Sequence, residues 1–125
     1  MSLDIQVYPP VNGNHYVTLA GRLDTHTHQL LDAHLSKLLQ SPRRAQVLVL
    51  DLAGVEYISS AGIRSIFKAR KALVPCDGRV LLLNPQAQIK EVLDLVNAVP
   101  VHEIFATPAE ADAYIDAIQQ RVLDG

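Results

Sequence analysis

The chain has 125 residues, of which 49% are hydrophobic and 19% are charged, a balance typical of one globular domain. A formal net charge of −2 argues against a surface that binds nucleic acid or acidic lipid. The single cysteine, Cys76, cannot form an internal disulfide, which favours a reducing compartment. No apolar run approaches the roughly 20 residues of a membrane span, and the first residues lack the pattern of a signal peptide. We therefore expect one cytoplasmic domain over residues 1–125.

The N-terminal segments alternate apolar and other residues at the period of a β-strand, at Ile5 and Val7 and again between residues 17 and 23. Between these segments, Asn12-Gly13 accepts the positive φ values of a tight reversal. The pattern predicts an antiparallel hairpin at the start of the chain.

The pattern then changes to helical spacing, with a stripe formed by Leu30, Leu31, His34, Leu35, Leu38 and Leu39. Asp24 or Thr25 can cap the start of this helix. Ser41-Pro42 ends it, because the residue before a proline is pushed out of helical geometry. Residues 47–52 follow as a strand that is apolar on both faces, which is typical of a parallel strand covered by helices.

A second amphipathic helix carries a stripe formed by Ile63, Ile66, Phe67, Arg70, Leu73 and Val74. Residues 80–83 then indicate another strand that is buried on both faces. Asn84-Pro85 starts a third helix, whose apolar stripe comprises Ile89, Val92, Leu93 and Val96.

A short apolar piece, Val101–Phe105, precedes the last helix, which has Thr107 as its cap and Pro108 as its first residue. The stripe of this helix comprises Ala113, Tyr114, Ala117, Ile118 and Val122. Strands that alternate with helices are joined by crossovers. The sequence thus predicts an α/β fold with a mixed, mostly parallel sheet, an N-terminal hairpin and about four helices packed on the sheet.

The segment from Asp51 to Ile66 carries the functional signal. A buried strand is predicted to end at Leu52, a loop to follow, and a helix to begin about Ser60 with Ser59 as its N-cap. Ser60 is then on the first turn, reachable from solvent, beside free amides and the positive end of the helix dipole, and Gly62 keeps the approach uncrowded. Such a place tolerates a phosphate, although a cap with no further role has the same spacing.

The stretch resembles the signature of the STAS family of anti-sigma factor antagonists. There, a strand ending in Asp-Leu and a loop with an aromatic precede Asp-Ser-(Ser/Ala/Thr)-Gly-(Leu/Ile) at a helix start. Here Ser59-Ser60-Ala61-Gly62-Ile63 stands in that place. The resemblance implies that Ser60 is the phosphorylated serine, with Ala61 as its small neighbour and Gly62 as the family's glycine.

Other parts of the chain extend the resemblance over about residues 3–120. Gly21-Arg22-Leu23-Asp24 resembles the family's Gly-Glu-Leu-Asp, whose aspartate lies near the phosphorylation site. Asn84-Pro85 and the stretch 93–105 resemble the family's third helix and final strand.

Two positions depart from the family pattern. Ser59 stands where many members have an aspartate, which removes a negative charge beside Ser60 and makes Ser59 a rival phosphoacceptor. Arg22 replaces an acid by a base, and that base could pair with a phosphate.

Metal and catalytic sites are not expected. Asp24, His26, His28 and, farther on, His34 tempt a metal interpretation, but no Cys or Glu completes the set, and residues i and i+2 diverge once a helix begins. His34 falls in the apolar stripe and is expected to be half-buried. A nucleophile elbow around Ser60 needs glycine where Ile58 stands, and no phosphate-binding loop motif exists. We expect no cofactor and no enzyme activity.

The resemblance implies a partner-switching protein. When unphosphorylated it binds an anti-sigma factor, a serine kinase of histidine-kinase-like ATPase fold, and phosphorylation of Ser60 releases it. The expected partner-binding surface comprises Asp24, Tyr57, Ile58, Ser59, Ser60, Ala61, Gly62 and Arg64. Two alternatives stay open: a STAS subunit that binds the ATPase of an ABC-type lipid or solute transporter, which the missing aspartate at position 59 leaves open, and a STAS domain that binds a small ligand or nucleotide.

Overall fold

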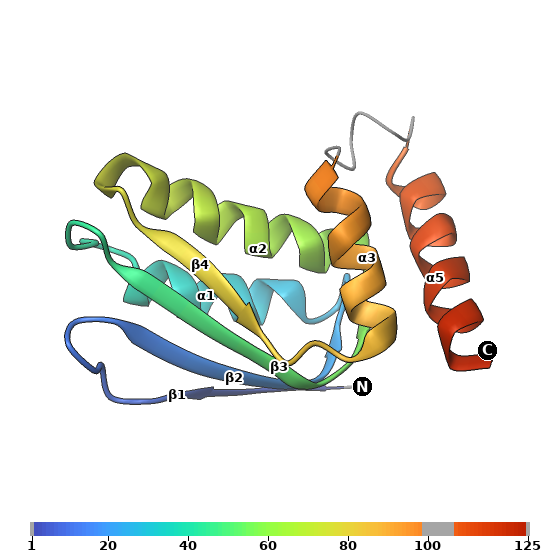
Figure 1. Cartoon of the computed structure of the whole chain (residues 1–125), viewed down its shortest axis with the longest axis horizontal. Coiled ribbons are helices and arrows are strands. Elements are labelled where there is room, and N and C mark those ends of the chain that lie inside the picture. Colours follow the sequence, from blue (N-terminus) through green and yellow to red (C-terminus); the bar gives the residue numbers. More distant parts are fainter. Residues whose placement is uncertain (1, 99–106, 125) are drawn as a thin grey trace.

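The computed structural model describes residues 2–98 and 107–124, with the elements arranged as in Figure 1. The strands and helices are β1 (Leu3–Val7), β2 (His15–Leu23), α1 (His28–Leu38), β3 (Val47–Ile58), α2 (Ser60–Leu73), the 3₁₀ turn η1 (Val74–Cys76), β4 (Arg79–Leu83), α3 (Ala87–Ala98) and α5 (Pro108–Asp124). The predicted apolar piece Val101–Phe105 lies outside the described residues. No described helix is both long and apolar enough to cross a membrane.

The sheet has the strand order β1-β2-β3-β4. β1 runs antiparallel to β2, whereas β2, β3 and β4 are parallel to one another. α1 and α2 pack side by side on one face of the sheet, and α3 and α5 lie beyond the ends at which β3 and β4 finish (Figure 1). The predicted mixed, mostly parallel α/β architecture is confirmed.

The predicted hairpin is also confirmed. Asn12 and Gly13 adopt φ values of 54° and 80°, and two backbone hydrogen bonds of 3.0 and 2.9 Å join Val11 to Asn14 across the turn. These positive φ values are the ones that Asn-Gly accepts with little strain, so the local sequence sets the reversal and thereby the register of β1 on β2.

β3 is longer than predicted, because the expected loop after Leu52 continues as strand to Ile58. The extension follows β2, whose last residues pair with it through two register shifts and end with Leu23 opposite Ile58. Gly54 permits the close approach, since a Cβ at this position would lie 2.7 Å from the Cβ of Ala20. The strand therefore delivers the chain directly to Ser59, with no intervening loop.

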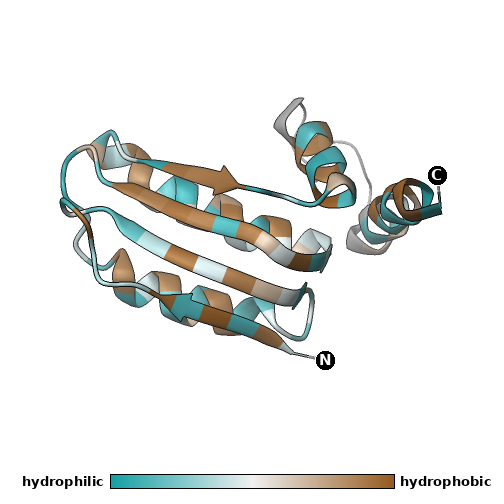
Figure 2. Ribbon diagram, turned by 60° about the horizontal axis from the view of Figure 1, so that its bottom comes forward, coloured by the Kyte–Doolittle hydropathy of each residue, from teal (hydrophilic) through white to brown (hydrophobic). Residues whose placement is uncertain are grey.

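β4 does not have the predicted burial on both faces, because Leu81 and Leu83 are each 41% exposed. Side chains alternate along a strand, so these two face away from the side that α1 and α2 cover. Figure 2 views the sheet from this uncovered side and shows β4 as a mostly apolar strand. Among the described residues β4 pairs only with β3, which places it at an edge of the sheet.

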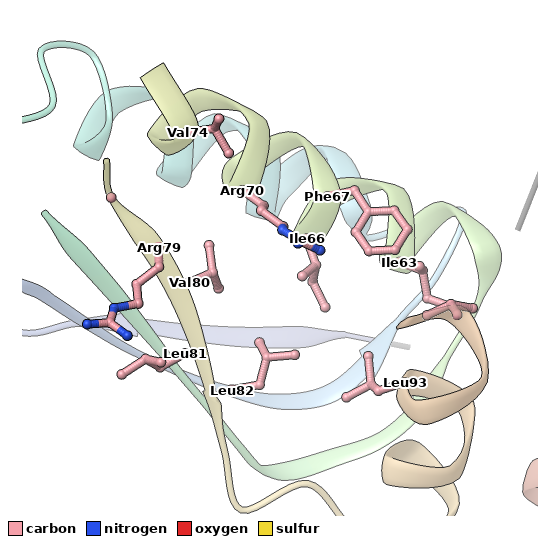
Figure 3. A pocket seen from close by; sticks show the side chains of 12 residues that line it. Ile63, Ile66, Phe67, Arg70, Val74, Arg79, Val80, Leu81, Leu82 and Leu93 are labelled. Carbon is pink, nitrogen blue, oxygen red and sulfur yellow. The ribbon is translucent and has the colours of Figure 1, made fainter. Parts of the chain in front are cut away.

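An apolar groove of about 530 Å³ lies between α2, β4 and α3 (Figure 3). Ile66 and Phe67 line it from α2, Leu82 lines it from β4, and Leu93 lines it from α3. None of the predicted partner-binding residues borders this groove, so it does not belong to the candidate site.

The predicted helix starts and stripes differ in accuracy. The stripe of α3 is buried as expected, and in α1 Leu31 and Leu35 are buried and His34 is half-buried. However, α1 begins at His28 with Thr27 as its N-cap residue, so the expected cap at Asp24 or Thr25 is wrong. Asp24 instead accepts hydrogen bonds within the turn that precedes the helix.

The inward face of α5 agrees only in part with the predicted one. Its cap is correct: Thr107 Oγ1 accepts from the Glu110 amide at 3.2 Å, and Glu110 accepts from the Thr107 amide. Of the predicted stripe, Ile118 is buried and Val122 is half-buried, whereas Ala113, Tyr114 and Ala117 are exposed. Ile115 and Gln119, which the prediction left out, are also buried. Small and aromatic residues on a helix do not by themselves determine its rotation. Here the inward face is formed by the apolar packing of Ile115 and Ile118 together with the bonds of Asp112 and Gln119 to α2 and β3.

Candidate functional site

Ser59 links the end of β3 to the start of α2. Its backbone N–H donates to the Leu23 carbonyl at 2.9 Å, which continues the pairing of β3 with β2 up to the helix. Its side-chain oxygen accepts from the Gly62 amide at 3.4 Å, and its carbonyl accepts from the Ile63 amide at 3.0 Å. The predicted N-cap at Ser59 and helix start at Ser60 are therefore confirmed.

Gly62 has a different role from the predicted one. A Cβ at this position would lie 2.7 Å from the Leu23 carbonyl oxygen and 3.1 Å from Cγ1 of Ile58. The glycine therefore allows the first turn of α2 to lie directly against the ends of β2 and β3, and it does not keep an approach to Ser60 open. A side chain at position 62 would push the helix away from the sheet.

Ser60 is not reachable from solvent, contrary to the prediction. It is 1% exposed, and its hydroxyl has no hydrogen-bond partner among the described residues. Its backbone N–H, one of the free first-turn amides of α2, donates to Oδ1 of Asp112 at 2.7 Å. Asp112 lies 52 residues later, on α5, so this contact exists only in the folded chain.

Asp24 is buried within a turn of its own. Its Oδ1 accepts from the amides of His26 and Thr27 at 2.9 and 3.2 Å, and its Oδ2 lies 3.4 Å from Nε of Arg22. Burial by itself raises the pKa of the Asp24 carboxyl, but the hydrogen bonds that the carboxylate accepts outweigh burial and leave this pKa below its ordinary value. Asp24 is therefore ionised at neutral pH and stabilises the turn between β2 and α1.

Tyr57 and Arg22 form a second contact layer beside this turn. The Arg22 guanidinium carbon lies 3.9 Å from the centre of the Tyr57 ring, a cation–π geometry. Burial raises the pKa of the Tyr57 hydroxyl, and a hydrogen bond to Asp116 with the charge of Asp112 raises it further. The phenol stays protonated, and Arg22 is already engaged by both Tyr57 and Asp24.

The remaining predicted residues divide between the interior and the surface. Ile58 and Ala61 are buried, whereas Arg64 points to solvent from the outer side of α2. Gln119 of α5 brackets Ile58: its Oε1 accepts from the Ile58 amide and its Nε2 donates to the Ile58 carbonyl, both at 3.1 Å. The structure brings the predicted residues together at the ends of β2 and β3, but most of them are covered.

Sequence reasoning missed three residues of this site, which are Asp112, Asp116 and Gln119. All three are polar residues of a C-terminal helix, where the ordinary expectation is contact with water. Nothing in their spacing separates them from a solvated face, so sequence offered no signal for them. Within residues 2–98 and 107–124, no group of three or more His, Cys, Asp or Glu side chains could hold a metal ion.

The site thus offers an anion the amides and positive dipole end of α2, next to a buried serine hydroxyl. The carboxylate of Asp112 accepts from the Ser60 amide, and the Ser59 hydroxyl oxygen accepts from the Gly62 amide. Backbone amides at a helix start are suitable donors for a phosphate, which carries close to two negative charges.

The sequence and the fold are similar to those of known proteins. The candidate anti-sigma factor antagonist BtrV of Bordetella bronchiseptica is 28% identical over 85 residues, which make up 68% of this chain and 72% of BtrV. The unphosphorylated anti-sigma factor antagonist SpoIIAA is similar with a TM-score of 0.62 at 19% identity, over 74% of this chain and 83% of SpoIIAA. The phosphorylated form of SpoIIAA, from Bacillus, is similar with the same TM-score.

The same fold occurs inside a larger protein. The murine anion transporter Slc26a9 matches 73% of this chain with a TM-score of 0.55 at 19% identity, although the match covers 14% of the transporter chain. A family model described as the STAS domain matches residues 3–111, which include all four strands, α1 to α3 and the Ser59–Ile63 segment. With this match over most of its length, the chain belongs to the STAS domain family.

Proposed function

We propose that the chain is an anti-sigma factor antagonist that works by partner switching. In its unphosphorylated form it binds an anti-sigma factor, and phosphorylation of Ser60 releases that partner. The observation that carries the proposal is the position of Ser60 on the first turn of α2, directly after the N-cap Ser59, in a chain of the STAS family. Two similar proteins support the proposal. BtrV and SpoIIAA both carry the description anti-sigma factor antagonist, and SpoIIAA has been solved in an unphosphorylated and a phosphorylated form.

The chemistry belongs to the partner. A serine kinase transfers the γ-phosphoryl group of ATP to Ser60 Oγ, ADP leaves, and the hydroxyl proton passes to a base of the kinase. In this proposal the chain is a substrate and a ligand, without catalysis of its own. The kinase is the anti-sigma factor itself, with the ATPase fold of the histidine kinases.

Electrostatics provides the release. A phosphate adds about −1.5 to −2 charges at neutral pH. At an interface this charge repels acidic groups of the partner and must lose water when the partner docks, so phosphorylation weakens the complex.

Titration of the isolated partner tests the switch. Ser60→Asp is expected to weaken binding by about tenfold or more, roughly 1.4 kcal/mol or above. Ser60→Ala is expected to bind like the wild type and to resist release by kinase and ATP. Ser36→Asp places the same charge on an exposed position of α1 and serves as the matched control. Because position 60 is buried, each variant needs a denaturant midpoint close to that of the wild type.

Mass spectrometry of the wild-type chain after reaction with the kinase provides a second readout that does not depend on any variant. Phosphate on Ser60 supports the proposal, and phosphate on Ser59 alone contradicts it. A second candidate is a STAS subunit that binds the ATPase of an ABC-type lipid or solute transporter, and the presence of this fold in the anion transporter Slc26a9 is the observation on its side. Capture of a transporter ATPase that binds without phosphorylating Ser60 would favour that candidate.

A further inference from the structure

The proposed phosphoacceptor is inaccessible in this structure. Ser60 is 1% exposed, and its hydroxyl is buried without a hydrogen-bond partner among the described residues. A kinase must bring the γ-phosphate within bonding distance of this oxygen, and a partner must touch the surface around it. Phosphoryl transfer to a hydroxyl buried in this way is not compatible with the observed packing, so some part of the chain has to move first.

α5 bonds to the backbone on both sides of Ser59. Asp112 accepts from the Ser60 amide at 2.7 Å, and Gln119, two turns later on α5, exchanges two hydrogen bonds of 3.1 Å with the backbone of Ile58. These bonds hold the residues on either side of Ser59. Tyr57 adds a third attachment through its hydrogen bond to Asp116.

The Asp112 carboxylate occupies the place that a phosphate on Ser60 would need. A carboxylate on a first-turn amide of a helix satisfies a free donor and the positive end of the dipole. A phosphate on Ser60 would use the same donors, with more charge than a carboxylate. The Asp112 carboxylate and a phosphate on Ser60 would therefore compete for the same amides, and their negative charges would repel each other.

The attachment of α5 is suited to opening. Its contacts with β3 and the start of α2 include hydrogen bonds of Asp112 and Gln119 to the backbone. Once α5 has left, these groups can form hydrogen bonds with water instead. The strands, α1 and α2 also contact one another directly, in contacts that do not involve α5. Ile115 and Ile118 of α5 belong to the same apolar cluster, so undocking of α5 exposes these two side chains as well.

We propose that α5 is an autoinhibitory cover, with Asp112 as a built-in substitute for the phosphate. While α5 is docked, Ser60 is neither phosphorylated nor contacted by a partner. Undocking exposes Ser60 and the end of β3, and a phosphate on Ser60 then keeps Asp112 from returning. The purpose of the cover rests on the proposed function, but its existence is a property of the isolated chain.

Thiol labelling measures the cover without any partner. In a chain carrying Cys76→Ser and Ser60→Cys, the alkylation rate of position 60 by iodoacetamide reports how often α5 opens. Gln119→Ala removes the bonds to Ile58 without a change of charge, and we expect it to accelerate labelling by about tenfold or more. Gln120→Ala, the exposed neighbour on the same helix, is the matched control and should stay within about twofold.

Two results overturn the cover. One is labelling in the parent chain as fast as in denaturant, and the other is equal acceleration by Gln119→Ala and Gln120→Ala. If the thiol chain does not fold, hydrogen exchange at the Ser60 amide in the chain with serine at position 60 replaces labelling. That amide should be protected, and Gln119→Ala should reduce its protection by a similar factor.

Different results would refute the proposed cover and the proposed switch. A wild-type chain that the kinase modifies on Ser60 as fast as the Gln119→Ala chain overturns the cover and leaves the proposed function in place. A Gln119→Ala chain that opens as expected but is not modified by a kinase proven to bind it supports the cover and overturns the switch.

Discussion

Around Ser60, backbone groups take their partners mainly from side chains. Asp24 serves the amides of the turn before α1, Asp112 serves the amide of Ser60, and Gln119 serves both backbone groups of Ile58. The bonds of Gln119 satisfy buried backbone groups of Ile58, which would cost more to leave unpaired than an ordinary hydrogen bond contributes. Single residues therefore set the geometry of the site, and their ionisation states matter.

Asp24 provides a prediction about pH. Its carboxyl pKa is lower in the folded chain than the ordinary 3.8, so its contribution to stability is complete above this value and is lost as the pH falls through the folded pKa. We expect Asp24→Asn to lower the free energy of unfolding by about 1 kcal/mol at pH 7. The difference from the wild type should shrink below a pH of about 3.8.

Chemical denaturation across this pH range measures the difference. Asp94→Asn, which removes an exposed carboxylate paired with Lys90, is the control and should change stability by less than about 0.5 kcal/mol. A difference between Asp24→Asn and the wild type that stays constant from pH 7 to pH 2 would show that the Asp24 charge has no role in the turn.

At the scale of elements, α2 begins where three constraints meet. Ser59 caps the helix, the Ser59 amide continues the pairing with β2, and Gly62 lets the first turn approach the Leu23 carbonyl. The long β3 brings the chain to this point without a loop, so Ser60 is held by the strand as well as by the helix. A helix start fixed in this way is a precise place for a modification.

The two adjacent serines should differ in their contribution to stability. Ser59→Ala removes the cap oxygen and should cost about 1 kcal/mol. Ser60→Ala should be neutral or slightly stabilising, because its hydroxyl is buried without a partner among the described residues and alanine favours the helix. Urea denaturation of both variants makes the comparison, and equal losses would mean that the cap is not at Ser59.

At the scale of the whole molecule, α5 joins the core formed by the sheet and the other helices. Ile115 and Ile118 are buried in the same apolar cluster as the strands, and α5 packs on α3 and on the start of α2. Figure 1 shows it as the outermost helix at the end of the molecule that carries the site. Its buried residues make it part of the folded unit.

Truncation of a buried side chain of α5 tests this membership. Ile115 is 0% exposed, and Ile115→Ala should lower the free energy of unfolding by about 2–4 kcal/mol. Leu123→Ala, at a position 63% exposed on the same helix, should change it by less than about 0.5 kcal/mol. An unchanged denaturant midpoint for Ile115→Ala would show that α5 does not belong to the cooperative unit.

Local sequence determined much of this protein. Asn12-Gly13 alone predicts the hairpin, Ser59 predicts the cap of α2, and Thr107-Pro108 predicts the start of α5, because each depends on backbone preferences within a few residues. Strands and helices in alternation predict the mixed sheet, since their order restricts the connections. The motif at Ser59–Ile63 likewise places the candidate site at one helix start.

Tertiary structure alone decided which side chains close that site. The rotation of α5, the continuation of β3 to Ile58 and the exposure of Leu81 on β4 depend on partners that are distant along the chain or absent from one face. Asp112 and Gln119 look like solvated residues in the sequence, yet they bond to backbone groups 52 and 61 residues away. Burial and unpaired backbone groups are properties of the assembled molecule, so periodicity within one helix cannot reveal them.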